Sequence, residues 1–188
     1  LFLAIKGKKN DGNKFISQAI KKGASIIISS TINKKYKNMI FKVGNEISFL
    51  KKFASLKRDN SKAKIIAITG SAGKTSIKNL LHDLLGKFGS THVSPRSFNN
   101  HFGVPISLSN LNENHQYGVF EVGMSNQGEI NQLTKMIKPN IGLITNIGEA
   151  HMENFKNIKG IAKAKSEIIN NIEINGTIIL NRDDRFFN

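Results

Sequence analysis

Alternating apolar and polar stretches divide the first part of the chain into short structural elements. Apolar runs at residues 1–5 and 24–29 are typical of strands, and residues 15–22 between them carry apolar positions at helical spacing. A second helical pattern covers residues 47–56 and runs into the charged stretch 57–62. The order strand, helix, strand, helix predicts a small α/β domain that ends at the charged stretch.

The rest of the chain continues with a longer alternation of strands and helices. The elements expected there are strand 65–69, helix 75–85, strand 117–121, helix 129–137, strand 141–146, helix 158–171 and strand 177–180. Helices between successive strands predict a parallel, doubly wound sheet, whose ligand lies beyond the carboxyl ends of the strands. The chain is therefore predicted to be an α/β protein with two domains, residues 1–60 and 61–188.

Composition and charge exclude some classes of protein without identifying a ligand. Hydrophobic residues make up 39% of the chain, enough for a core, and no apolar run approaches the ~20 residues that a membrane span needs. The absence of cysteine excludes disulfides and thiolate metal sites and fits a reducing compartment. A net charge of +15 would attract nucleic acid, anionic lipid or a phosphorylated small molecule. Because the lysines are scattered, a solvated Lys-rich surface is the leading interpretation, and a basic nucleic-acid-binding module is the distant alternative.

The strongest local signal follows the apolar strand 65–69. It reads Thr69-Gly70-Ser71-Ala72-Gly73-Lys74-Thr75-Ser76 and leads into the predicted helix. Gly70 and Gly73 let backbone N–H groups turn toward a phosphate, and Lys74 adds a positive charge. Thr75, at the helix start, can bind Mg²⁺. We therefore expect residues 69–76 to bind ATP.

An accidental turn is the alternative, because the loop departs from the usual spacing. The common phosphate loop has a glycine six residues before its lysine, and Ile68 occupies that position here. A Gly-Lys-Thr tripeptide alone is common in proteins. The strand before it and the helix after it are what favour phosphate binding.

Several segments together resemble the Mur ligase superfamily, which also includes folylpolyglutamate synthase and cyanophycin synthetase. The segments that carry the resemblance are the phosphate loop, Ser97–Pro105, Phe120–Ile130, Asn146–His151 and Lys163–Ile168. Residues 1–7 with Asp11-Gly12 resemble the family's domain for the uridine nucleotide. The resemblance implies a partial N-terminal domain for the UDP-linked precursor, 1–60, and a partial ATP-binding central domain, 61–188, without the family's third domain, which receives the amine substrate. The chain is also expected to begin inside a strand, as a fragment would.

Within the family, segments 97–105 and 128–130 resemble the members that add D-alanyl-D-alanine. They imply an ATP-dependent ligase that joins UDP-MurNAc-tripeptide to D-alanyl-D-alanine through an acyl phosphate, with two Mg²⁺ ions, in peptidoglycan synthesis. The implied partners are these small molecules, without nucleic acid or a membrane span, and we expect a cytoplasmic monomer. A sister ligase, tripeptide-forming or similar to folylpolyglutamate synthase, is the alternative. These 188 residues alone are expected to bind nucleotide weakly and not to complete ligation.

The resemblance implies a catalytic set of Lys74, His151 and Lys165, and metal ligands Thr75, Glu121, His151 and Lys165. Glu121 ends the predicted strand 117–121, where a hard carboxylate suits Mg²⁺. An exposed strand-end glutamate is the alternative. His151 follows the strand 141–146 and matches a histidine that the family assigns to a second Mg²⁺, although a surface histidine is otherwise the commoner case.

Lys165 stands out by its position as well. It lies on a helical apolar stripe formed by Ile158, Ile161, Ala162, Ile168, Ile169 and Ile172. An ammonium directed inward must find an anion, lose its proton or be modified. In most Mur ligases the matching lysine is carbamylated and holds the second Mg²⁺, so carbamylation is implied here. A side chain that reaches solvent is the alternative.

Two further predictions concern asparagines and the helix after the phosphate loop. Asn99 and Asn100 are expected to contact the substrate, with turn formation as the alternative. Asn146 is expected to contact substrate or to order the loop that it begins, with a turn-forming asparagine as the alternative. Asn181 is expected to meet the ribose of ATP or to cap a turn. The buried face of the helix is expected to consist of Ile77, Leu80, Leu81, Leu84 and Leu85.

Overall fold

The computed structural model describes residues 1–7 and 10–187 and divides the chain into two compact units, Leu1–Lys52 and Phe53–Asn188. The division falls within helix α2, Glu46–Asp59, shortly before the charged stretch 57–62. Two α/β units in this order agree with the predicted fold class. What each unit binds is not decided by the division and stays a prediction.

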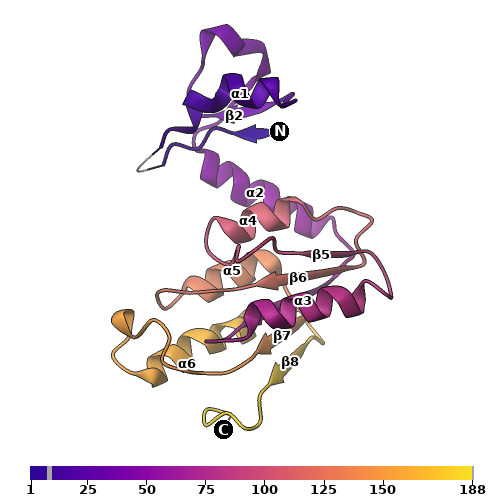
Figure 1. The fold of residues 1–188 in the computed structure, drawn as a ribbon, viewed down its shortest axis with the longest axis vertical. Coiled ribbons are helices and arrows are strands. Elements are labelled where there is room, and N and C mark those ends of the chain that lie inside the picture. Colours follow the sequence, from indigo (N-terminus) through magenta and orange to yellow (C-terminus); the bar gives the residue numbers. More distant parts are fainter. Residues whose placement is uncertain (8–9, 188) are drawn as a thin grey trace. The chain divides into compact units, whose positions relative to one another are not determined.

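The first unit contains a parallel sheet of three short strands in the order β1-β2-β3 (Figure 1). The strands are β1 Phe2–Leu3, β2 Ile27–Ser29 and β3 Ile40–Lys42, and the helical elements are η1 Gly12–Phe15, α1 Ile16–Lys21 and η2 Lys34–Met39. Ala4, Ile16 and Ile27 form its buried core. Sequence analysis did not predict β3, because this strand has no fully buried residue and therefore no apolar run.

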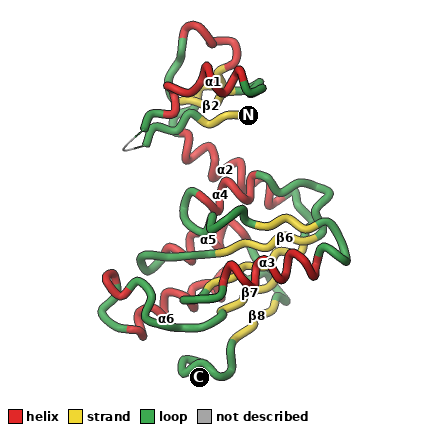
Figure 2. The backbone as a smooth tube through the Cα atoms, in the orientation of Figure 1, coloured by secondary structure: helices red, strands yellow, loops and turns green. Residues whose placement is uncertain are grey.

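The second unit is a five-stranded parallel sheet in the order β5-β6-β4-β7-β8 (Figure 2). Its strands are β4 Lys64–Thr69, β5 Thr91–Val93, β6 Tyr117–Glu121, β7 Ile141–Ile144 and β8 Thr177–Leu180. Helices alternate with the strands along the chain. The predicted doubly wound parallel sheet is therefore confirmed.

The direction of each crossover decides which face of this sheet a helix covers. From β4 the chain passes β6 to reach β5 and then moves the opposite way, to β6, β7 and β8. Right-handed crossovers in opposite directions place their helices on opposite faces. α3, Lys74–Leu85, therefore covers one face, and α4 Gly103–Ser109, α5 Glu129–Ile137 and α6 Ile158–Ser166 cover the other (Figure 1).

Each face has its own hydrophobic core. On the α3 side, Ile66, Ile68 and Val119 of the sheet pack against partly buried residues of the helix. The opposite side holds the larger core, which includes Ile65, Ala67, Leu108, Phe120, Ile130, Ile137, Ile161 and Ile168. Successive side chains of β4 therefore point alternately into one core and the other, as expected for a central strand of a sheet that is covered by helices on both faces.

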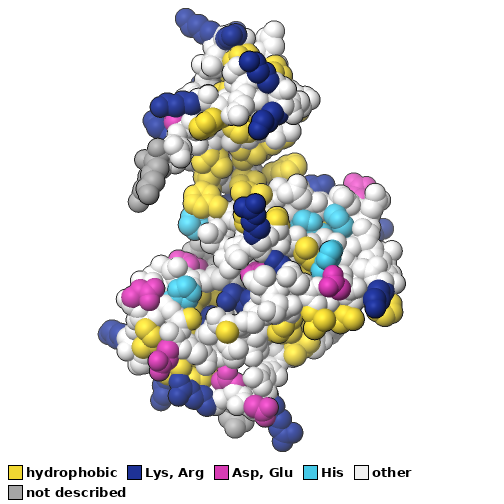
Figure 3. Space-filling view, in the orientation of Figure 1, with side chains coloured by type: hydrophobic (Ala, Val, Ile, Leu, Met, Phe, Trp, Pro, Cys, Tyr) yellow, Lys and Arg dark blue, Asp and Glu magenta, His cyan; other side chains and the backbone are white. Residues whose placement is uncertain are grey.

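The buried face of α3 differs from its prediction. Leu80 and Leu84 are 57% and 44% exposed, whereas Lys78 is only 2% exposed. Figure 3 shows hydrophobic side chains on the surface along this helix. Ile77, Leu81 and Leu85 of the predicted face pack against the sheet, whereas Leu80 and Leu84 do not. Lys78 was not predicted to be buried, and it can be because it finds oxygen partners under the helix.

Other differences concern short elements. β5 and α4 were not predicted, because a strand of three residues and a helix of seven are too short to show periodicity. The predicted helix 158–171 changes at Glu167 into the 3-10 helix η4, Glu167–Asn171. β7 ends at Ile144, two residues before the predicted end.

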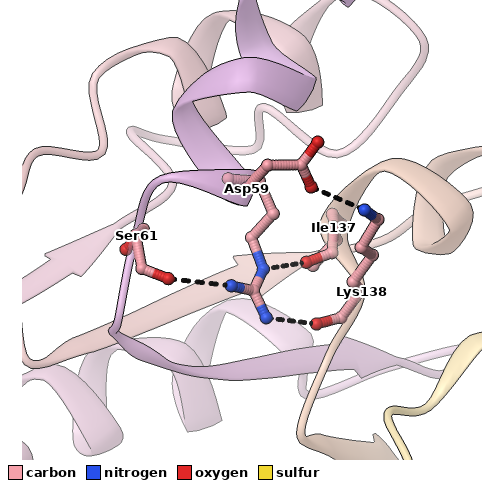
Figure 4. Close-up of polar contacts among 5 residues, drawn as sticks. Asp59, Ser61, Ile137 and Lys138 are labelled. Atoms are coloured by element: carbon pink, nitrogen blue, oxygen red, sulfur yellow. Dashed lines mark hydrogen bonds and ion pairs between the residues drawn. The ribbon is translucent and has the colours of Figure 1, made fainter.

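Arg58, in the last turn of α2, binds the C-terminal end of α5. Its Nε donates to the carbonyl of Ile137 at 2.7 Å, and one terminal nitrogen donates to the carbonyl of Lys138 at 2.7 Å. The other terminal nitrogen donates to the carbonyl of Ser61 at 3.3 Å (Figure 4). The side chain thus satisfies carbonyls that a helix end leaves without intrahelical partners. Asp59 beside it pairs with Lys138 at the surface.

Two surface properties bear on the partner classes considered above. No helix among residues 1–7 and 10–187 is long and apolar enough to cross a bilayer. On the face drawn in Figure 3, the Lys and Arg side chains are spread out rather than gathered into one patch.

Candidate active site

The strand order gathers three loops at the carboxyl edge of the sheet. β4 lies between β6 and β7, with Ile68 in register with Glu121 and Thr69 in register with Ile144. The loop after Thr69, the end of β6 at Glu121 and the loop after β7 therefore meet at this edge. This is the position at which doubly wound sheets bind ligands.

The phosphate loop adopts a conformation that depends on glycine. Gly70 and Gly73 have φ of +147° and +81°, in the region that favours glycine. A Cβ at Gly70 would lie 1.8 Å from Oγ1 of Thr145. The phosphate loop and the loop after β7 therefore approach each other too closely for any side chain at position 70. α3 begins directly at Lys74.

Lys74 folds back over this loop. Its Nζ donates to the carbonyl of Gly70 at 2.7 Å. Burial lowers the pKa of Lys74, and Glu121 opposes that shift by attraction. The positive end of α3 and the ammonium of Lys74 are therefore directed to the same place, which is an arrangement that favours an anion.

The loop after β7 is hydrogen-bonded to the phosphate loop. Asn146 accepts from Ser71 N through its carbonyl and from Ala72 N through Oδ1, both at 3.0 Å. Ser71 Oγ donates to the carbonyl of Gly148 at 3.0 Å and accepts its N–H at 2.8 Å. The hydroxyl of Thr145 donates to the carbonyl of Ala72. Asn146 therefore orders the phosphate loop, in addition to standing at the start of its own loop.

Glu121 is buried and paired with a lysine. It is 1% exposed, and its Oε1 lies 3.0 Å from Nζ of Lys78 without meeting the geometry of a hydrogen bond. The backbone N–H of Glu121 donates to Ser94 Oγ at 3.3 Å. The exposed strand-end glutamate considered as the alternative does not exist here.

Lys165 is buried, as its apolar stripe predicts. It is 2% exposed, and among the described residues its ammonium has no hydrogen bond or ion pair. Burial and repulsion by Lys74 lower the pKa of Lys165 to about 8. The side chain does not extend into solvent as an ordinary surface lysine does. Near pH 8, an appreciable fraction of the Lys165 amine is neutral.

His151 occupies a different environment. It lies in the left-handed region with φ of 65°, at the start of η3, Met152–Asn154, and its side chain is 44% exposed. Its Nδ1 is 3.8 Å from a carboxylate oxygen of Glu153. Within residues 1–7 and 10–187, no three His, Cys, Asp or Glu side chains lie close enough to hold a metal ion together. The structure thus places Lys165 and Glu121 near Lys74 and leaves His151 on the surface.

Asn99 and Asn100 have different surroundings. Asn100 Oδ1 accepts the N–H groups of Phe102 at 3.0 Å and Gly103 at 2.9 Å, so its side chain forms the turn before α4. The carbonyl of Asn99 accepts from Gly123 at 2.7 Å, and its side chain lies against that glycine at the end of β6. Asn99 is the one of the two that faces the carboxyl edge.

A pocket of about 190 Å³ adjoins the loop after β7. Its lining comprises Ile144, Asn146, Ile147, Ala162, Ser166, Ile169, Leu180, Asn181, Asp184, Phe186 and Phe187. Oδ1 of Asn181 accepts from Asp183 N at 3.1 Å, so this side chain caps a turn while lining the pocket. Asp184 accepts the N–H of Ile147 at 2.6 Å and thereby connects the segment after β8 to the loop after β7.

Sequence analysis missed Lys78, Thr145 and Asp184. Lys78 is four residues after Lys74, so the two share a helix face, and this spacing was a signal that could have identified it. Thr145 and Asp184 gave no such signal. Their partners, Ala72 and Ile147, are distant in sequence and come close only through the strand order.

The fold and the site define a doubly wound α/β protein with a phosphate loop at the switch point of its sheet. Residues 68–188 match the model of the Mur ligase middle domain, and residues 1–58 match that described as the Mur ligase family, catalytic domain. The first of these matches covers more than half of the chain. The chain belongs to the Mur ligase family.

Individual relatives agree with this family. The chain is 43% identical, over its whole length, to UDP-N-acetylmuramoyl-tripeptide–D-alanyl-D-alanine ligase of Rickettsia prowazekii, of which it covers 42%. A crystal structure of MurF from Acinetobacter baumannii superposes with a TM-score of 0.87 at 34% identity, covering 98% of this chain and 41% of that one. MurF of Thermotoga maritima, crystallised with ADP, superposes with a TM-score of 0.82 at 33% identity, covering 96% of this chain and 42% of that one. The chain therefore spans about two fifths of the length of these relatives.

Proposed function

We propose that the protein containing this chain is an ATP-dependent ligase that joins UDP-MurNAc-tripeptide to D-alanyl-D-alanine. The observation that carries the proposal is the phosphate loop of residues 69–76 beside buried Glu121, at the carboxyl edge of the sheet. The relatives named above support the choice of substrates. Among sister ligases, the segments 97–105 and 128–130 favour the dipeptide-adding members.

The proposed reaction is carboxylate activation followed by amide formation. The terminal carboxylate of the precursor attacks the γ-phosphate of ATP, which releases ADP and leaves an acyl phosphate. The D-alanyl-D-alanine amine then displaces inorganic phosphate and loses a proton. Phosphoryl transfer depends mainly on positioning and charge neutralisation, and Lys74 with the loop N–H groups would provide both. No protein nucleophile is needed.

Magnesium fits the residues at this edge. Oε1 of Glu121 is buried and accepts no hydrogen bond, and its ion-pair partner is the Lys78 ammonium, so it is an oxygen donor of the kind that suits a hard cation. Thr75 is the second residue of α3, at the end of the phosphate loop, and supplies a hydroxyl. We propose that these two residues hold Mg²⁺, which would neutralise phosphate charge.

Lys165 is the proposed site of carbamylation. A neutral amine is the form that reacts with CO₂, and the lowered pKa of about 8 increases its neutral fraction. The carbamate would replace a buried ammonium that has no partner with an anion. Such a group near Lys74 would be attracted to its charge, and we propose that it and His151 would supply ligands for a second Mg²⁺.

Two regions are proposed for the rest of the substrates. The pocket lined by Asn146 and Asn181 has largely apolar walls and would receive the base and ribose of ATP. Asn99 is proposed to contact the precursor, whose uridine nucleotide would bind the unit Leu1–Lys52. The absence of cysteine fits our proposal that the reaction takes place in the cytoplasm.

Calorimetry and acceptor assays test the proposal with the intact protein. We expect Mg-ADP to bind and Lys74→Ala to lose this binding, because the variant removes a charge from the phosphate site. We expect ATP hydrolysis to be coupled to ligation only with D-alanyl-D-alanine, and not with single amino acids such as glutamate. Folded protein that binds no nucleotide would refute the ligase assignment, and coupling to single amino acids would indicate a sister ligase.

A further inference from the structure

Lys78 is a buried cation one helical turn after Lys74. Its Nζ donates to the carbonyl of Ser94 at 2.9 Å and to that of Arg96, and it lies 3.0 Å from Oε1 of Glu121. Lys78 and Glu121 are 2% and 1% exposed. Because both charges are removed from water, neither is easily tolerated without the other.

The two carbonyl contacts hold the ammonium independently of Glu121. Ser94 and Arg96 follow β5, whereas Glu121 ends β6. Arg96 adopts a left-handed φ of 49°, and its carbonyl accepts from Lys78. The ammonium of Lys78 would therefore stay in place when a metal ion takes the carboxylate oxygen.

The charges around Glu121 disfavour a metal ion that arrives alone. Lys78 pairs with the carboxylate directly, and Lys74 is close enough to interact with it electrostatically. Two ammonium groups and one carboxylate leave this group of three with a positive charge. A divalent cation is repelled by such a group, whereas bound phosphates reverse its sign.

We propose that Lys78 is a positioning residue that holds Glu121 in place and makes metal binding depend on bound nucleotide. The metal ion then enters together with the nucleotide and not before it. This inference rests on the proposed function, because it takes the phosphate loop as the nucleotide site.

The first test uses Mn²⁺ as the probe and the intact protein without any substitution. Free Mn²⁺ is measured by electron paramagnetic resonance in titrations with and without ADP. We expect Mn²⁺ to bind at least about tenfold more tightly with ADP, after the binding of Mn²⁺ to ADP alone is subtracted. Equal affinities in the two titrations would overturn the proposal.

The second test replaces the ammonium. Lys78→Met removes one repelling charge and frees Glu121, so nucleotide-free Mn²⁺ binding should become at least about tenfold tighter than in the unsubstituted protein. Lys78→Arg keeps the charge and should leave that binding weak. A purely structural role for Lys78 predicts no gain of metal binding, and a folded Lys78→Met variant without this gain contradicts the proposal.

A double variant controls for folding and for ions bound elsewhere. Lys78→Met leaves Glu121 buried without a counter-ion, which destabilises the fold. Lys78→Met combined with Glu121→Gln removes both charges, and it should fold and lack the gained Mn²⁺ site. A gain that persists in the double variant would place the metal elsewhere and overturn the proposal.

These outcomes separate the inference from the proposed function. Failure of ADP to bind under any condition refutes the nucleotide site. The Mn²⁺ titrations without nucleotide still compare Lys78→Met with the unsubstituted protein, and they decide the role of Lys78 by themselves.

Discussion

Asn146 binds both backbone polar groups of Ala72. Its Oδ1 accepts the N–H at 3.0 Å, and its Nδ2 donates to the carbonyl at 3.4 Å. In the free protein, an uncharged amide thus takes an N–H group of the proposed phosphate-binding loop. The loop after β7 therefore contributes directly to the conformation and the charge of the nucleotide site.

Asn146→Asp should weaken nucleotide binding. The carboxylate keeps an acceptor for Ala72 N but adds a negative charge beside the phosphates. We expect the affinity for ADP to fall at least about tenfold, because like charges at this distance repel. Calorimetry measures the change, and adenosine, which lacks phosphates, is the control. If ADP bound equally well, the phosphates would not lie at Ala72.

Gly70→Ala should disrupt the phosphate loop. The added Cβ would lie 1.8 Å from Oγ1 of Thr145, at a φ of +147° that alanine rarely adopts. We expect loss of ADP binding and a clear decrease in the midpoint of thermal unfolding. Gly148→Ala is the matched control in the facing loop, since its Cβ would meet Ser71 at an ordinary 3.5 Å. Similar effects of the two substitutions would contradict the geometry.

Arg58→Met should destabilise the second unit far more than Asp59→Asn. The first change leaves the carbonyls of Ser61, Ile137 and Lys138 without their donor (Figure 4). We expect a cost of roughly 2–4 kcal/mol in the free energy of unfolding. Asp59→Asn removes an ion pair in which both side chains are nearly half exposed, worth less than about 1 kcal/mol. Urea unfolding compares them, and equal costs would refute this account.

His92 should lower the stability of the protein as the pH falls from 6.5 toward about 4. Burial and repulsion by His115 lower the pKa of His92 from 6.5 to about 4. Between these values the unfolded chain binds a proton that the folded protein does not. Stability is therefore full above pH 6.5 and falls as the pH decreases toward 4, by up to about 3 kcal/mol.

The variant His92→Gln isolates this effect. Glutamine can keep the hydrogen bond that Nε2 of His92 forms with Ser107 at 3.0 Å, but it does not titrate. Urea unfolding at about pH 7, 5.5 and 4.5, of which the last two lie within this window, should show a smaller loss of stability in the variant. The exposed histidine in His82→Gln serves as the control and should change nothing. Equal pH profiles for all three proteins would exclude His92 as the cause.

Lys165→Met should stabilise the protein while abolishing ligation. The pKa of Lys165 falls from 10.5 to about 8, so the folded protein binds fewer protons between these values and stability rises with pH across that window. Below pH 8 the cost of the buried ammonium is complete. In CO₂-depleted buffer at pH 7, we expect a gain of roughly 1–3 kcal/mol in Lys165→Met.

The matched control is the exposed Lys163→Met, which should leave stability unchanged. Bicarbonate provides a second comparison, because carbamylation would stabilise the unsubstituted protein and not Lys165→Met. Mass spectrometry of the native protein would detect the added CO₂. A thermal midpoint that is the same with and without bicarbonate would argue against the modification.

Local patterns predicted several elements with their bounds. The strand 117–121, the helix 129–137 and the strand 177–180 have the predicted bounds. Each combines a clear period with glycine or polar residues at its ends, so its conformation is fixed mostly by neighbours in sequence. β5 and α4 lack such a pattern, because they are short, and the burial of most of α4 depends on residues from elsewhere.

Residue patterns along the chain indicated the phosphate loop and most of the strands and helices, since glycine positions and apolar periodicity act over a few residues. Only the tertiary structure decided that Lys78 is paired with Glu121 and that Asn146 binds Ala72. Those contacts join residues on different strands and helices. They depend on strand order and on how α3 packs across the sheet, and no local pattern of residues contains that information.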